Sequence, residues 1–400
     1  MTDDATRPDG EDDGDLGLSL VRGDVLYRAQ RAIGLIPERG LGLGRRALLL
    51  ALVTWVPIAA WAFVAHRALP GVPGEPLLQH FGVHVRCLLA IPLLVLAEGV
   101  AHAVTVRLVP YFVASGVVRE RDVPAFRDVV RGVAALRDST RPWVVLVAIL
   151  VAWTYLTPVA TDVHEVVWAS EGGEQTGLGF GALWFLYVAR PIYFALLLGW
   201  IWRIVLVFVL LHRISRLDLS LVPSHPDGAM GLAFLEGLPG GFSLVALASS
   251  TVIASRWAHD VLYHDVHVDS LRLPAVALLV LNVLLFTGPL LAFLPKLAPA
   301  RRAALLQYGA LVGGQGRLVH RRWVDGDEAV AERPILSAPE IGPVADANAL
   351  YDAVARSRTI LVGKRALLSV LVPAALPLVA VFAIEVPVKE LLLKLLTTLA

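Results

Sequence analysis

The stretch from Trp257 to Asp269 places three histidines among three aspartates, between two long apolar segments. Imidazole and carboxylate groups are common ligands of zinc and of other borderline divalent metals. Two further histidines lie four positions apart near residue 80, a spacing that puts both on one face of a helix. The candidate metal ligands are therefore His259, His264, His267, Asp265, His80 and His84.

Two other interpretations of these histidines stay open. Imidazole titrates near neutral pH, so the cluster could sense protons. It could also be no more than a polar loop, because neither an HExxH nor a paired CxxC motif accompanies it. Zinc or another divalent metal is thus a hypothesis that rests on residue types and spacing.

A second set of ionisable residues lies inside apolar segments. Glu98 and His102 are one helical turn apart, and Arg86 precedes them in the same segment. Arg190 and Arg203 lie in another segment and are their candidate partners. Charges in hydrocarbon are costly, so such residues suggest a proton or ion pathway. The competing interpretations are an internal ion pair that fixes helix register and an arginine that extends to the interface.

A third motif reads His225-Pro226-Asp227-Gly228. Proline followed by aspartate and glycine favours a tight turn, and Asp227 could cap the helix that follows. His225 could instead bind a ligand or take part in catalysis, and the turn with its capping aspartate is the interpretation we favour. No catalytic residue is assigned.

The elements that carry these residues are membrane helices. The chain has 56% hydrophobic and 17% charged residues and a mean hydropathy of +0.67, too apolar for a soluble domain. Crossing a bilayer takes about 20 apolar residues. We predict an all-α polytopic bundle of about seven spans with amphipathic interfacial helices, the spans being 47–65, 83–106, 143–161, 180–211, 240–257, 274–294 and 366–384.

Arginine and lysine indicate the orientation. They are dense before the first span and in the second, fourth and sixth connections, and sparse in the other three. This alternation predicts a cytoplasmic N-terminus in a multi-pass protein. Pro373 and Pro377 interrupt the last span, so a six-span or re-entrant variant is the alternative. Arg190-Pro191 predicts a kink or tilt in the long fourth span.

Outside the spans, the sequence divides into recognisable stretches. A helix over 124–137 would lie on anionic lipid or pack under the bundle. The sixth connection is expected to hold two helices, over 299–323 and 343–356. The predicted divisions are an acidic disordered tail 1–20, an interfacial cytoplasmic helix 21–46, a six-span core 47–295, a cytoplasmic helical connection 296–365, and a last span with a C-terminal amphipathic helix 366–400.

The turn motif continues through Leu235 in a pattern of the form HPD-x-A-x-G-L-x-F-L. In this stretch the chain resembles a group of bacterial integral membrane proteins. The resemblance extends to Gln307-Tyr308-Gly309-Ala310 and to the ending that begins at Pro387, and it covers mainly the second half. It implies a bacterial cytoplasmic membrane and transfers no activity.

Several functions lack a motif in this chain. There is no P-loop, no GxSxG elbow and no basic-aromatic pattern for nucleic acid, and no internal repeat is evident. We expect a protein that moves or gates an ion or small solute, rather than an enzyme. The alternatives are a membrane-embedded metal-dependent enzyme on a lipid or envelope substrate, and a non-catalytic assembly or sensory partner. Expected partners are the bilayer, anionic lipid at the basic helices, and a protein or second copy of the chain.

Overall fold

The computed structural model describes residues 17–37, 40–70, 76–156, 166–169, 178–326 and 342–385. This part of the chain is helical, which confirms the all-α class. Six helical runs in it are long and apolar enough to cross a membrane. They are Leu43–Val64, Phe81–Ala114, Phe180–Ser215, Ala233–Tyr263, Val268–Arg321 and Lys364–Phe382.

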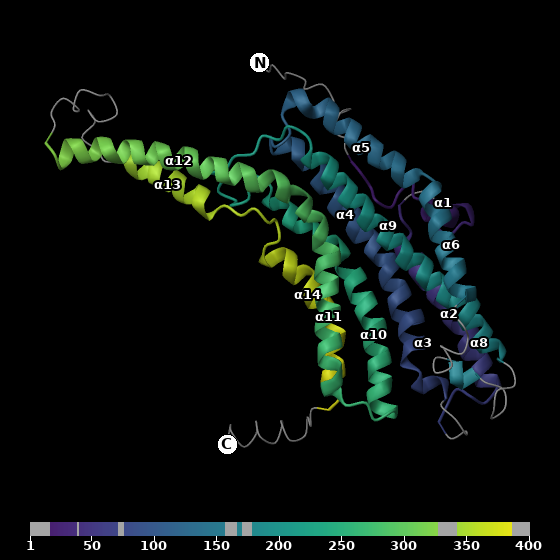
Figure 1. Cartoon of the computed structure of the whole chain (residues 1–400). Coiled ribbons are helices and arrows are strands. Elements are labelled where there is room, and N and C mark those ends of the chain that lie inside the picture. Colours follow the sequence, from purple (N-terminus) through teal and green to yellow (C-terminus); the bar gives the residue numbers. More distant parts are fainter. Residues whose placement is uncertain are drawn as a thin grey trace, which may run out of the picture.

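The runs are built from the helices labelled in Figure 1. The α-helices are α1 Val25–Ala32, α2 Leu43–Val64, α3 Phe81–Val85, α4 Ile91–Ala114, α5 Val123–Asp138, α6 Arg141–Leu156, α8 Phe180–Trp184, α9 Arg190–Ser215, α10 Ser243–Tyr263, α11 Arg272–Thr287, α12 Leu294–Trp323, α13 Gly342–Arg356 and α14 Lys364–Phe382. The π segments are η3 Arg86–Ala90 and η7 Phe185–Ala189. The 3₁₀ segments are η2 Leu77–Gln79, η4 Glu120–Asp122, η6 Val167–Ala169, η8 Ala233–Phe242, η9 Val268–Leu271 and η10 Gly288–Phe293.

One predicted span is shorter than expected, and another settles an alternative. The third, 143–161, corresponds to α6, whose 16 residues are apolar but fewer than the six long runs contain, and residues 157–161 lie outside the described part. The seventh corresponds to α14, which is one continuous helix in spite of Pro373 and Pro377. The re-entrant segment considered for those prolines is therefore not seen.

The bundle has two chemically different ends. At one end, which we call the histidine end, His80 and His259 stack and Trp61 packs on Trp168. At the other, the arginine end, the backbone N–H of Ser220 after α9 donates to Val117 O after α4, at 2.8 Å. α4 and α9 therefore both run from the histidine end to the arginine end.

The runs that contain α4 and α9 are built alike. Each begins with five α-helical residues, the first two of which are Phe-Gly, and continues with five π-helical residues. A long α-helix follows, with proline at its second position. Pro92 and Pro191 lack an N–H, and their rings would clash with the carbonyl four residues earlier. A wider π turn before each proline relieves that clash. The π segment η7 ends directly before Arg190-Pro191, where the sequence predicts a kink or tilt. This local repeat was not recognised in the sequence.

The N-terminal segment, of which residues 17–37, 40 and 41 are described, is part of the bundle. Leu18, Leu20 and Val21 are buried, although residues 17–20 were expected in a disordered tail. α1 buries Tyr27 and Gln30 instead of lying only on a membrane surface. The segment therefore acts as a packed element. The rest of the acidic tail, residues 1–16, and the predicted C-terminal helix beyond 385 lie outside the described part of the chain.

α5 packs against the bundle with its apolar face. Phe126, Val130 and Val133 are buried, and the Phe126 ring lies 5.8 Å from that of Phe112 on α4. The helix over 124–137 was expected either on anionic lipid or packed under the bundle, and α5 has the packed position.

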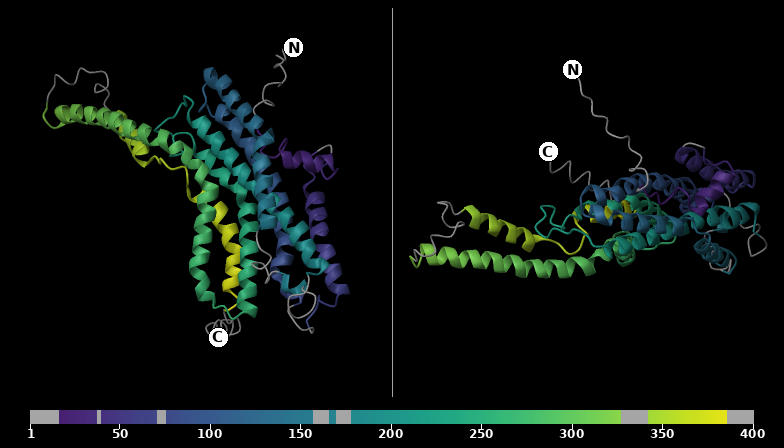
Figure 2. Two further views of the ribbon diagram at one scale, coloured as in Figure 1. Left: turned by 45° about the vertical axis from the view of Figure 1, so that its right-hand side comes forward. Right: turned by 90° about the horizontal axis from the view of Figure 1, so that it is seen from above.

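The sixth connection forms an arm. α12 and α13 match the two helices expected there and pack on each other. α11 continues through η10 into α12. The helices α12 and α13 together extend away from the bundle at the arginine end (Figures 1 and 2). The connection therefore begins inside a helical run.

Candidate functional site

Four charged side chains meet inside the bundle. Glu98 of α4 bridges two arginines: its Oε2 lies 2.6 Å from Arg46 Nη1 of α2, and its Oε1 lies 2.9 Å from Arg203 Nη2 of α9. Arg203 Nη2 also lies 3.2 Å from Asp24 Oδ2 of the N-terminal segment. All four side chains are at most 1% exposed. We call this group the charge centre; with every member ionised it is neutral.

The N-terminal segment contacts both ends of the charge centre. Arg46 Nε donates to Gln30 Oε1 at 2.7 Å, and its Nη1 also donates to the Leu41 carbonyl at 3.3 Å. Asp24 approaches Arg203 from the other side. The chain of contacts therefore begins and ends in residues 24–41, and this segment covers the centre.

Several donors in the charge centre have no protein partner. Among the described residues, Arg46 Nη2 and Arg203 Nε and Nη1 are buried without a hydrogen bond, and so is Asp24 Oδ1. The face of the Arg203 guanidinium rests on the Trp200 ring, 4.8 Å from its centroid. Buried polar groups are normally satisfied, so these atoms point to water or to a small ligand.

Local sequence explains how the centre is assembled. Gly42, with φ of +58°, starts α2 in the left-handed region, and a Cβ there would come within 2.4 Å of Pro37 Cδ. This turn puts Arg46 in the first turn of α2. α2 meets α4 closely at Gly99, where a Cβ would lie 2.4 Å from Leu43 Cδ1. Small residues allow such close helix approach.

α9 is fixed to α4 one turn away from Glu98. Trp200 Nε1 donates to the Leu94 carbonyl at 3.0 Å, and Trp200 is fully buried. Leu94 is four positions before Glu98, so the bond sets the register between the two helices at the level of the charge centre.

The Asp24 carboxyl lies in a different environment from that of an exposed aspartate. Burial raises the pKa of Asp24, and the Glu98 charge raises it further, against the lowering effect of Arg203. The Trp143 indole also lies near enough to lower the pKa, although its N–H is outside hydrogen-bond geometry. The net effect is a pKa above the ordinary value, so Asp24 binds a proton at a higher pH than an exposed aspartate does.

The predicted pathway residues do not converge as a set. Glu98 and Arg203 meet, as proposed from the sequence. His102 Nδ1 instead lies 2.9 Å from Ser19 Oγ. Arg190 precedes Arg203 by about 20 Å along the helix axis, so it cannot join the same contact. Its guanidinium lies 5.8 Å from the Phe194 ring.

Arg86 has a separate environment nearer the histidine end. Its guanidinium lies 5.2 Å from the Phe185 ring and 5.6 Å from the Tyr193 ring, both of the neighbouring π-turn helix. It precedes Glu98 by about 18 Å along the helix. The cation–π geometry is that of a packing contact between the two repeated runs.

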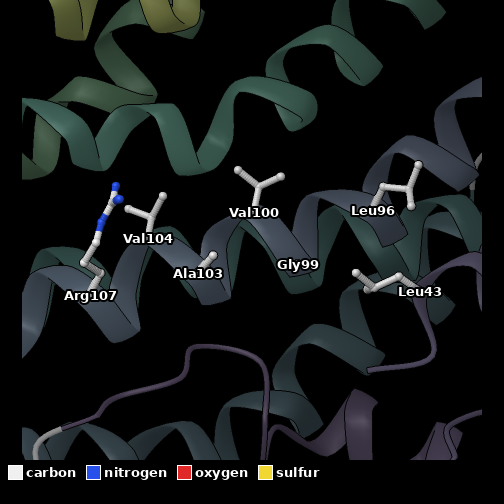
Figure 3. A pocket seen from close by; sticks show the side chains of 7 residues that line it. All are labelled: Leu43, Leu96, Gly99, Val100, Ala103, Val104 and Arg107. Carbon is white, nitrogen blue, oxygen red and sulfur yellow. The ribbon is translucent and has the colours of Figure 1, made fainter. Parts of the chain in front are cut away.

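Along the described helices, two apolar grooves are lined by neither Glu98, His102 nor Arg190. One, of about 520 Å³, follows α4 from Leu96 past Gly99 to Arg107, where it ends in a guanidinium (Figure 3). The other, of about 610 Å³, lies between α10 and α14 and is almost entirely apolar. Such linings suit acyl chains better than a polar solute. No residue of the charge centre lines either groove.

The histidine end brings only some of the candidate ligands together. The rings of His80 and His259 stack 5.0 Å apart with planes 27° apart, and His264 packs edge-on to His259 at 5.1 Å. Ring nitrogens point outward in the ring plane, so nearly parallel rings do not aim at one ion. Within the described residues, no three His, Cys, Asp or Glu side chains are grouped to hold a metal.

The other candidate ligands have separate contacts or positions. Trp55 Nε1 donates to His84 Nδ1 at 2.9 Å, and His84 Nε2 is 3.0 Å from the Leu77 carbonyl, which occupies both ring nitrogens. His267 and Asp265 lie on the exposed turn after α10, and Asp265 has a φ of +52°. The metal hypothesis therefore gains no support from this geometry.

The turn motif is a structural junction at the arginine end. The Asp227 carboxylate accepts backbone N–H groups from Ala229, Gly231 and Ala233 at 2.8, 3.1 and 3.0 Å. Its Oδ1 also lies 2.9 Å from His225 Nδ1. Burial alone would raise the pKa of Asp227, but these hydrogen bonds together lower it below its ordinary value. The expected capping role of Asp227 fits this arrangement.

Sequence reasoning missed three members of the site: Asp24, Gln30 and Arg46. Arg46 was read as one of the arginines that set topology, and Asp24 as part of a surface helix. One signal was available, because Asp24 is the single acidic residue between Asp15 and Glu38, in a stretch rich in arginine. An isolated carboxylate in such a stretch indicates a specific partner.

The fold and the site together define a class. This is an all-helical chain whose six long apolar helices are compatible with an integral membrane protein, with a charge centre buried among them. No family model matches the chain, and neither a curated protein nor a solved structure matches it.

Proposed function

We propose that the chain crosses a bacterial cytoplasmic membrane seven times, with its N-terminus in the cytoplasm. α4 and α9 run in the same direction, so the chain between them has to return across the membrane, and α6 is the apolar helix of that stretch. The arginine end then faces the cytoplasm, as positive charge in the connections favours.

We further propose that the protein moves or gates an ion or small solute and that the charge centre is the gate. The observation that carries this proposal is the presence of four charges from four chain segments, buried in the bundle with unpartnered guanidinium nitrogens. Intramembrane charge is expensive and typically marks a substrate or proton route.

The centre is closed in this structure, which favours a gate over an open channel. Asp24 and Gln30 cover it from the N-terminal segment, and neither groove on the surface reaches Glu98. The hydrogen bonds between the described part of that segment and the rest of the bundle each involve at least one side chain. The long helices could therefore stay in place while the centre opens.

A purely structural ion-pair network makes a different prediction, and flux measurements separate the two. The test uses purified protein in liposomes and a panel of ions and protons. The double variant Arg46→Gln/Glu98→Gln keeps the centre neutral and should stay folded. We expect it to change flux by about tenfold or more, which corresponds to about 1.4 kcal/mol in a barrier.

Asp218→Asn is the matched control, because its carboxylate pairs with Arg119 at the surface, 3.2 Å away, outside the centre. It should leave flux unchanged. A wild-type protein that supports no flux of any ion tested, or a double variant with wild-type flux, would count decisively against the gate.

We propose a second, peripheral role for the arm: contact with anionic lipid at the cytoplasmic surface. Arginine and apolar residues line one exposed face of α12, and Leu306 on that face is 77% exposed. This pattern suits a helix that rests on anionic headgroups. The residues of that face are Arg302, Leu306, Ala310, Arg317 and Arg321.

Native mass spectrometry tests the arm. Replacing Arg302, Arg317 and Arg321 by Gln should reduce the number of phosphatidylglycerol molecules that stay bound, whereas Arg131→Gln on α5 should not. Equal lipid retention in the triple variant and the wild type would remove this role. A protein subunit or second copy that stays bound through Leu306 would support the assembly role instead.

A further inference from the structure

We infer that the charge centre is a binding site for a small carboxylate anion and that Asp24 occupies it as an internal substitute. The inference builds on the proposed gate by naming the ligand that the gate recognises. Its readouts are binding and segment movement, so it can fail while the flux proposal stands.

Charge balance is the first argument. Without Asp24 the centre keeps two guanidinium groups and the Glu98 carboxylate, a net charge of +1 in a fully buried place. An uncompensated buried charge is strongly destabilising. The centre therefore requires one further negative charge, and Asp24 supplies it in this structure.

Donor geometry is the second argument, because Asp24 uses the site incompletely. It makes one contact to Arg203, at 3.2 Å through Oδ2, while its Oδ1 has no partner. Arg203 Nε and Nη1 and Arg46 Nη2 are also unpartnered among the described residues. A guanidinium pairs best with a carboxylate through two parallel bonds. A free carboxylate, which no backbone restrains, could satisfy more of these donors than Asp24 does.

The third argument is that Asp24 can leave without unfolding the bundle. It belongs to the N-terminal segment rather than to any of the six long helical runs. Besides Asp24, the polar contacts between the described part of this segment and the rest of the bundle each involve a side chain. They include Ser19 with His102, Arg137 with the Ser19 carbonyl, Arg28 with the Asp138 carbonyl at 2.8 Å, and Arg46 with Gln30 and with the Leu41 carbonyl. Burial of Leu18 and Val21 keeps it docked until a competing anion takes the place of Asp24.

The size of the ligand follows from the side chain that it would replace. Beyond its Cα, aspartate is one methylene and one carboxylate, the size of acetate. Glu98 already neutralises one arginine, so a single negative charge completes the site. Formate and acetate are therefore the probes of choice.

The first test is chemical rescue of Asp24→Ala at pH 7. The variant should lose thermal stability in detergent, and formate should restore roughly half of the lost midpoint or more in a saturable way, because a ligand that binds only the folded state stabilises it. Chloride at equal ionic strength should restore much less, since it cannot form two parallel bonds. Asp218→Ala, a surface carboxylate variant, should show no formate effect.

The second test follows the segment in an otherwise intact protein. The chain has one cysteine, the buried Cys87, so Val21→Cys in a Cys87→Ser background gives a single reporter thiol. Its reaction with a maleimide should be slow and should become several-fold faster with formate or acetate. Asp24→Asn in the same background should react fast without any added anion.

Each outcome bears on the inference. An Asp24→Ala protein that can be purified only with formate supports it as directly as a rescued midpoint. Equal stability of this variant with formate and with chloride, together with a labelling rate of Val21→Cys that carboxylates do not change, would overturn it.

Discussion

Replacing Glu98 with Gln is expected to lower the free energy of unfolding by about 3–5 kcal/mol, the usual cost of removing one partner from a buried ion pair. Both oxygens of Glu98 contact guanidinium groups that are at most 1% exposed. The amide has nearly the same shape but no charge. Within the described residues, Arg203 would then keep only the Asp24 carboxylate, and Arg46 would lose the carboxylate that it contacts. The readout is the fraction of monodisperse protein against temperature in detergent.

A compensated variant serves as the control for this prediction. Arg46→Gln/Glu98→Gln removes one positive and one negative charge and should be more stable than Glu98→Gln alone, which is non-additive behaviour expected of contacting residues. A Glu98→Gln midpoint equal to that of the wild type would show that the charge centre contributes nothing to folding.

Replacing Asp227 with Ala should cost about 3 kcal/mol, because hydrogen bonds to a charged group contribute about 1.5–3 kcal/mol each and do not add fully. Three backbone N–H groups would lose their acceptor. The loop also carries the Arg358 N–H bond to the Gly228 carbonyl, at 2.8 Å, and so joins the connection between α13 and α14 to the loop after α9. Thermal midpoints in detergent report the loss.

Asp227→Asn and Asp218→Ala bracket this effect. Asparagine keeps one acceptor oxygen and should be intermediate, whereas the Asp218 pairs at the surface should contribute close to nothing. If Asp227→Ala were as stable as Asp218→Ala, the motif would not be the junction that its geometry indicates.

The Asp227 contribution should depend on pH in a defined direction. The pKa of Asp227 in the folded protein lies below the ordinary value of 3.8, so the folded protein binds fewer protons than the unfolded chain does. The stabilisation is therefore present above about pH 3.8 and is lost as the pH falls through the lower folded pKa. The difference between the wild type and Asp227→Asn should shrink as the pH falls below about 4.

Two of the four residues of the charge centre, Glu98 and Arg203, could be identified as candidates from the sequence. Glu98 and Arg203 stand out because each interrupts an apolar run, and their pairing follows from the cost of burying either alone. Arg46 does not stand out, because it lies at the edge of a span, where charge is ordinary. Asp24 lies in a polar segment, where its isolation among arginines is the only signal. Residue type cannot reveal their partners when the contact joins positions 24 and 203.

The histidine cluster illustrates the opposite error. His80, His259 and His264 do come together from distant parts of the chain, as the hypothesis of a metal site required. Their rings stack on one another, and His84 uses both nitrogens on Trp55 and Leu77. Spacing along a helix predicts which residues share a face, and it contains no information on where each ring points.

What the sequence determined by itself is the class of the chain: helices, apolar runs and a turn capped by Asp227. These properties depend on residues close together, because hydropathy adds up along a segment and capping acts over a few positions. Only the tertiary structure decided that residues 17–41 pack inward and close a centre of four charges. That arrangement depends on how α2, α4 and α9 are rotated about their axes, which is set by long-range packing at Gly99 and Trp200.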